Sequence, residues 1–241
     1  MTADVQDNLL SHYFWKKMMN MLLCVAVLVL GISAFLDAAM RNKTNWLTDF
    51  RFMTVNGTLY TVLTAGLTAA VCLREFISQK EIYNPFLYSL RLSSAVTECV
   101  IAMVIALSFL PFIPDSPDIF RYDSFCMHVV IPLLSVISFL LFETPEDRLR
   151  PLHRLSSVWL IAAYAAVMIP LIAAGVIPRR WIPYSFLDIG FQPIWYVLLA
   201  GVIVFAGAMF FARLLFSVNR YYTDRWAARV IRFEKKRPRS G

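Results

Sequence analysis

The sequence predicts an all-α membrane protein that crosses the bilayer six times. Of its 241 residues, 59% are apolar and only 16% are charged, a composition too apolar for an ordinary soluble domain. The apolar residues fall into separate runs, each close to the roughly 20 residues that a helix needs to cross the hydrocarbon. These runs cover residues 18–40, 54–73, 92–111, 124–142, 156–177 and 193–216.

The first run follows Lys16 and Lys17, as the apolar core of a signal peptide would. It extends from Met18 to Leu36, longer than such a core, and no persuasive small-residue cleavage site follows it. We therefore expect a retained membrane helix.

Lysines and arginines predict the orientation. With six spans both termini lie on one side of the membrane, and that side carries most of the Lys and Arg, above all in residues 220–239. The positive-inside rule therefore puts both termini in the cytoplasm. The net charge of +7 is then mostly membrane-surface charge. We expect a multi-pass protein of the plasma or inner membrane in a bacterium, or of an endomembrane or the plasma membrane in a eukaryote.

Residues 217–241 form a basic tail after the last run of the 1–216 membrane domain. Its aromatic and apolar residues recur at helical spacing among cations, a pattern typical of a helix lying on anionic lipid headgroups. They are Tyr222, Trp226, Val230 and Phe233. No base-reading module accompanies the tail, so we expect no nucleic-acid partner.

The four cysteines all lie in or at the ends of predicted spans: Cys24, Cys72, Cys99 and Cys126. Their spacing fits no metal motif, and a free cysteine in such a place behaves as a small buried apolar residue. The sequence therefore indicates no disulfide, no metal and no cofactor.

The stretch from Asp123 to Phe142 carries one histidine, His128, near its polar end and Pro132 four residues later. A histidine inside a membrane span needs a partner, so it is a site candidate. Proline has no N–H and leaves the carbonyl of His128 without its helical donor. We therefore expect the helix to kink where the imidazole lies.

The second run places small or hydroxylated side chains along one helical face, which predicts that this face looks into the bundle. Close packing of helices in membranes accounts for most of them. The face consists of Thr54, Thr58, Thr61, Ala65, Thr68 and Cys72. Packing accounts less well for Thr54, because it lies at the outer entrance of the span.

Ionisable residues mark other positions. Glu98 is expected about two turns inside the cytoplasmic boundary, Asp37 lies at the outer end of the first span, and Asp188 precedes the sixth. Tyr184, in the loop before Asp188, is expected at the membrane interface. The predicted topology puts Thr54, His128 and the loop with Asp188 at one depth near the outer surface.

Short motifs in this order resemble the family of the androgen-inducible and androgen-dependent TFPI-regulating proteins and its bacterial six-helix relatives. The motifs are Phe52-Met53-Thr54, Met127-His128 with Ile131-Pro132, and residues 182–188. The resemblance covers most of the chain. It implies an intramembrane hydrolase acting on fatty acid esters of hydroxy fatty acids, with Thr54 as nucleophile and His128 as base. Bacterial relatives tend to have asparagine where this chain has Thr58, a departure that affects the pocket.

The chemistry of this assignment is sound, because a threonine hydroxyl needs a neighbouring base that neutral imidazole supplies. A third group should orient the ring, and Asp188, Asp37 or Glu98 could do so, with Asp188 favoured. Asn56, Thr58 and backbone N–H groups are candidate oxyanion donors.

Two other classes of function remain open. A transporter or lipid-binding protein would use the same outer-leaflet pocket without chemistry, although the chain has no evident internal repeat or paired broken helices. A regulatory or scaffold protein would recruit partners through its basic tail.

Overall fold

The computed structural model describes residues 3–41, 46–80, 82, 84–108, 120–145 and 155–236, in which all regular elements are helices. The long helices are α1 (Ala3–Arg41), α2 (Met53–Ser78), α3 (Pro85–Ser108), α5 (Ile131–Phe142) and α8 (Ile194–Lys236). Shorter elements complete the fold. They are η1 (Trp46–Arg51), α4 (Tyr122–Phe125), the π-helical turn η4 (Cys126–Val130), α7 (Trp159–Ala173), η5 (Arg179–Trp181) and η6 (Ser185–Leu187).

Five helical segments among the described residues are long and apolar enough to cross a membrane. They are Phe14–Arg41, Met53–Ser78, Pro85–Ala106, Tyr122–Phe142 and Ile194–Arg225. The fold class predicted from the sequence, an all-α multi-pass membrane protein, is therefore confirmed. The predicted fifth span corresponds to α7, whose 15 residues are fewer than the roughly 20 that span a bilayer. The sixth crossing and the orientation stay predictions.

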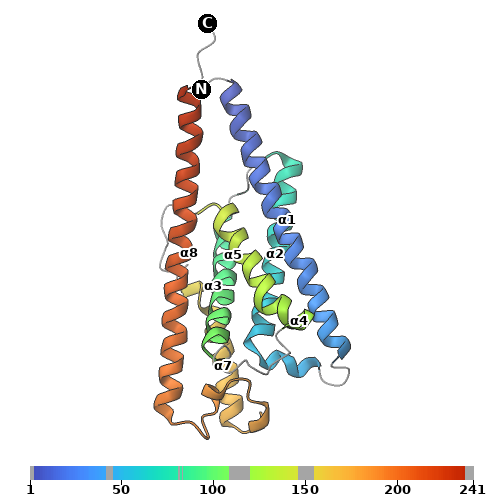
Figure 1. The fold of residues 1–241 in the computed structure, drawn as a ribbon, viewed down its shortest axis with the longest axis vertical. Helices are drawn as coiled ribbons and strands as arrows, with labels where there is room; N and C mark the ends of the chain where they lie inside the picture. Colours follow the sequence, from blue (N-terminus) through green and yellow to red (C-terminus); the bar gives the residue numbers. More distant parts are fainter. Residues whose placement is uncertain are drawn as a thin grey trace.

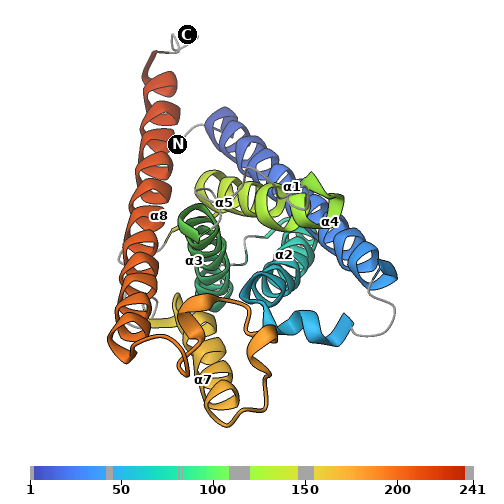
Figure 2. The ribbon, with the colours of Figure 1, turned by 60° about the horizontal axis from the view of Figure 1, so that its bottom comes forward.

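The helices form a bundle in which α1 packs on α2, α2 on α3, and α3 on α8 (Figure 1). The segment α4–η4–α5 lies across this bundle and contacts α1 and α3 (Figure 2). At the lower end in Figure 1, α7 and the loop after it lie beside the start of α2. This end of the bundle is called the pocket end below.

Several helices extend beyond the predicted apolar runs. α1 begins at Ala3, before the first apolar run. α3 begins at Pro85, about two turns before the third apolar run. α8 continues without a break through residue 217, so the predicted tail extends the last helix up to Lys236. Residues 109–111 of the third predicted span and 237–241 of the tail lie outside the described residues.

The predicted inward face of α2 is confirmed. All its members, from Thr54 to Cys72, are buried. Two buried hydroxyls of α2 are satisfied within the helix, since Thr64 and Thr68 each donate to a backbone carbonyl of the preceding turn, at 3.1 and 2.9 Å. α8 buries a narrower face, with Ala208, Ala212, Leu215 and Phe216 packed into the core. Its apolar outer residues, such as Val202 and Phe205, are exposed and suit contact with lipid.

Gly31 lets α1 approach α2 closely, because an added Cβ would lie 2.1 Å from a methyl carbon of Val62. Gly31→Ala should therefore separate the two helices and cost about 1–3 kcal/mol, the usual cost of overpacking. Thermal unfolding in detergent measures this. Gly201→Ala is the matched control, since nothing lies within 4 Å of the added carbon. Equal stability of the two variants would contradict the close approach.

Candidate functional site

A cavity of about 900 Å³ lies at the pocket end, between α1, the start of α2 and the α4–η4 segment. Its walls are mainly apolar and include Leu28, Ile32, Leu59 and Leu63. Both Thr54 and His128 line it. The charge and span order predict only that these two residues share a depth in the membrane, and the hydrolase hypothesis predicts a pocket that joins them. In the structure both line the same cavity.

Thr54 is the second residue of α2, where the helix begins after extended Phe52. The first N–H groups of any α-helix lack intrahelical partners and point out of its end. In α2 the N-cap residue, Phe52, makes no side-chain hydrogen bond to them. The positive end of the helix dipole adds to them. The Thr54 hydroxyl therefore lies beside groups that stabilise negative charge.

His128 lies in the π-helical turn Cys126–Val130, shortly before Pro132. The sequence predicts an irregular helix at this point, and the structure has one in the form of a π-turn, closed by a bond from the N–H of Ile131 to the carbonyl of Cys126. Such turns are often found at functional sites. The extra residue of the π-turn alters the direction in which the imidazole projects.

A backbone carbonyl orients the imidazole. Nδ1 of His128 lies 2.7 Å from the carbonyl oxygen of Ser124, and because a carbonyl can only accept, Nδ1 must carry the proton and donate it. In the neutral ring Nε2 is then an acceptor. That tautomer is the one a general base needs.

Tyr184 closes the cavity from the loop after α7. Its hydroxyl lies beside the Thr54 hydroxyl and the backbone N–H groups of Met53 and Thr54. Burial raises the pKa of Tyr184, against the opposing effect of these neighbouring groups, so the phenol is neutral at physiological pH. The sequence predicts Tyr184 as an interface anchor and possible pocket residue, and the structure puts it in the cavity wall.

α7 holds this loop in place. The Tyr164 hydroxyl donates to the carbonyl oxygen of Arg51, two residues before α2, and Met168 and Ile172 pack with Leu187. Trp159, at the other end of α7, donates to the Tyr60 hydroxyl at 3.2 Å. α7 thus ties the loop of Tyr184 to the start of α2.

One rim of the cavity is charged. Asp123 lies between two arginines, 2.8 Å from Arg41 and 2.8 Å from Arg121. All three residues line the cavity, together with Asp49. Asp123 begins the stretch that carries His128, yet the sequence gives no sign that α1 supplies its partner. It is a cavity residue that sequence reasoning missed.

Asp188, favoured from the sequence as the group that orients the ring, pairs with Arg179 at 2.8 Å and is not among the described residues that line the cavity. Asp37, another candidate to orient the ring, forms an ion pair with Arg41. The Ser124 carbonyl accepts the hydrogen bond from Nδ1 of His128 that the sequence predicts an acidic side chain to accept.

Asn56, Thr58 and Glu98 also lie outside the cavity lining. The side-chain amide of Asn56 donates to the carbonyls of Phe50 and Phe52 at 2.6 and 2.9 Å, so it shapes the entry to α2 and is not a free oxyanion donor. Thr58 is fully buried, and Glu98 is buried near the middle of α3.

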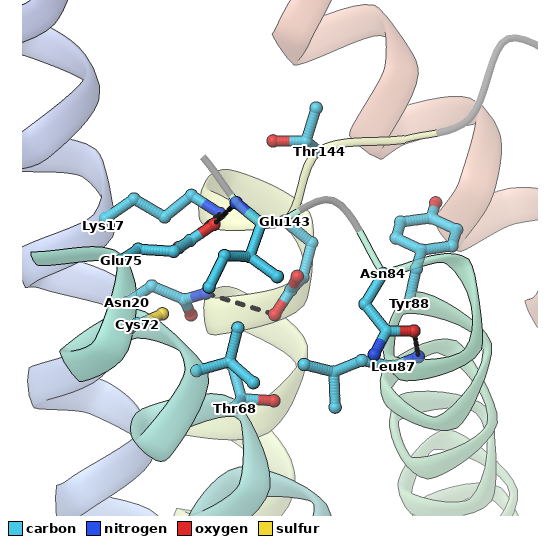
Figure 3. Close-up of a pocket in the computed structure, with 12 residues that line it drawn as sticks. Lys17, Asn20, Thr68, Cys72, Glu75, Asn84, Leu87, Tyr88, Glu143 and Thr144 are labelled. Atoms are coloured by element: carbon cyan, nitrogen blue, oxygen red, sulfur yellow. Dashed lines mark hydrogen bonds and ion pairs between the residues drawn. The ribbon is translucent and has the colours of Figure 1, made fainter. Parts of the chain in front are cut away.

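A polar cluster occupies the other end of α2 and is shown in Figure 3. Glu75 pairs with Lys17 at 3.0 Å, and Asn20 donates to Glu143 at 3.1 Å. Arg91 donates to Ser138 at 2.8 Å and pairs with Glu143 at 3.4 Å. The cluster ties α1, α2, α3 and α5 together at their polar ends.

The chain matches no protein-family model, and no curated protein or solved structure is similar to it. The resemblance noted from short motifs therefore stays an expectation. The candidate site is defined by the geometry described above.

Proposed function

We propose that this protein is an intramembrane lipid ester hydrolase in which Thr54 is the nucleophile and His128 the base. The observation that carries the proposal is that both residues line one largely apolar cavity. The bond from Nδ1 of His128 to the Ser124 carbonyl supports it, because it leaves Nε2 free to accept a proton.

In the proposed reaction Nε2 of His128 takes the hydroxyl proton while Oγ1 of Thr54 attacks the ester carbonyl. The tetrahedral intermediate collapses when the C–O bond to the alcohol breaks and the imidazolium returns the proton to the leaving alkoxide. Water then attacks the acyl-threonine with His128 again as base, releasing the acid and restoring Thr54. Each proton that the ring takes up is given back.

Oxyanion stabilisation is assigned to the start of α2. The N–H groups of Met53 and Thr54 lie beside the Tyr184 hydroxyl, and Tyr184 can itself donate while neutral. Preorganised donors of this kind act on charge that develops in the transition state. In this scheme the hydroxyl of Tyr184 shares the donors with the substrate oxygen.

The cavity suits a lipid with two chains and a polar end. Its apolar walls accept acyl chains, and its volume of about 900 Å³ is at the upper end of small-molecule sites. The charged rim, where Arg41 and Arg121 pair with Asp123, suits the polar end of the lipid. Fatty acid esters of hydroxy fatty acids, the substrate class implied by the motif resemblance, combine these features.

Tyr184→Phe tests the assigned oxyanion group. It removes only the hydroxyl that lies beside Thr54 and the first N–H groups of α2, so kcat should fall about 10- to 100-fold with little change in KM. Steady-state ester hydrolysis measures this. Tyr196→Phe, on α8 outside the cavity lining, is the control. A fall in both variants would indicate a general loss of structure.

The function itself is tested with the purified full chain in detergent and a panel of long-chain esters that includes fatty acid esters of hydroxy fatty acids. Turnover of one ester class is the expected result. Saturable binding of these lipids without turnover would instead favour a lipid-binding or transport protein that uses the same cavity.

A further inference from the structure

A group of buried polar atoms near the middle of the bundle has no hydrogen-bond partner. Glu98 is 0% exposed, and neither of its carboxyl oxygens is bonded within the described residues. The hydroxyls of Thr58 and Thr97 are also buried and unbonded there. Buried polar groups almost always have partners, so such a group indicates a bound species.

These atoms come from the facing sides of α2 and α3. The Thr61 hydroxyl lies beside the Glu98 carboxyl, although without a hydrogen bond of normal geometry, and it accepts a bond from Ser94 at 3.0 Å. Thr97 packs against Gly57, the residue before Thr58. Residues 57–61 of α2 therefore face residues 94–98 of α3, and Thr58, Thr61, Thr97 and Glu98 belong to these facing segments.

No cation of the protein neutralises Glu98 within the described residues. Arg91 is on the same helix but two turns away, about 10 Å along the axis. Its guanidinium is bonded to Ser138 and Glu143. An isolated carboxylate without water costs many kcal/mol, so a buried acid either takes up a proton or is paired with a cation or a metal ion.

We propose that Glu98 and the hydroxyls of Thr58, Thr61 and Thr97 bind a small monovalent cation, sodium, between α2 and α3. Carboxylate and hydroxyl oxygens are ligands for hard cations. One carboxylate balances one positive charge, whereas a divalent ion would leave a net charge in the membrane interior. The site is separate from the Thr54 and His128 cavity, because none of its residues lines that cavity.

The test measures thermal unfolding of the purified full chain in uncharged detergent, in sodium chloride, potassium chloride or choline chloride at equal ionic strength. A cation that binds only the folded protein raises Tm as its concentration rises. We expect a saturable rise of several degrees in sodium over choline. Glu98→Gln should abolish the difference, and Thr97→Val should shift it to higher sodium concentrations.

Thr68→Val is the matched control, because Thr68 is buried on α2 like Thr58 but its hydroxyl already donates to the Thr64 carbonyl. It should keep the response to sodium. An equal Tm in all three salts would overturn the proposal, as would a sodium response that persists in both Glu98→Gln and Thr97→Val. If Glu98→Gln does not fold, an unchanged sodium response in Thr97→Val overturns the proposal by itself.

Discussion

Thr54→Ala and His128→Ala should each lower ester hydrolysis at least about a hundredfold, the usual contribution of a positioned base or nucleophile. Each substitution removes one member of the pair that faces the cavity. Since the two groups act as a unit, the double variant should be little worse than either single variant. Initial rates at saturating ester measure the loss.

Thr64→Ala provides the control for these variants. Thr64 lies on the same buried side of α2, and its hydroxyl donates to the Thr61 carbonyl. Thermal unfolding of all variants shows whether they remain folded. If Thr54→Ala and His128→Ala both fold and hydrolyse esters at the parental rate, the assignment is contradicted. If the rate losses of the two single variants multiply in the double variant, the two residues do not act in one step.

Arg91→Met should destabilise the protein by about 3–5 kcal/mol, the range found when one partner of a buried ion pair is removed. Arg91 is 1% exposed, and its loss leaves Glu143 and Ser138 without their cationic donor. The shift of the unfolding midpoint in a denaturing-detergent titration measures this.

Arg74→Met is the control for this prediction. Arg74 is on the exposed side of α2, and a surface charge there should change stability by less than about 0.5 kcal/mol. If Arg91→Met were as stable as Arg74→Met, the polar cluster would not hold the helices together. If the double variant Arg91→Met with Glu143→Gln were more stable than Arg91→Met alone, the unpaired acid would be identified as the cause.

Periodicity made much of the fold predictable. Apolar runs of bilayer length predict the long helices, and the repeat of small residues from Thr54 to Cys72 predicts which face of α2 is buried. Pro132 predicts an irregular turn at His128, because proline has no N–H to bond with the carbonyl four residues before it. These features depend on neighbours in the sequence, and so they can be read from it.

Contacts between distant residues could not be predicted in this way. Tyr184 brings a loop next to the start of α2, a helix far away in the sequence. Charge counting assigns Arg91 to the surface of one membrane side, but Glu143 and Ser138 hold it inside the bundle. The sequence suggests an acid to orient His128, while the π-turn lets a carbonyl of its own helical segment do so.

The most direct test of the hydrolase assignment is the position of a covalent label. The purified protein is treated with a fluorophosphonate, digested and sequenced by mass spectrometry. The account predicts one adduct on Thr54, absent in Thr54→Ala and strongly reduced in His128→Ala. An adduct on another residue, or a failure of the ester-hydrolysing protein to react, would contradict a threonine nucleophile.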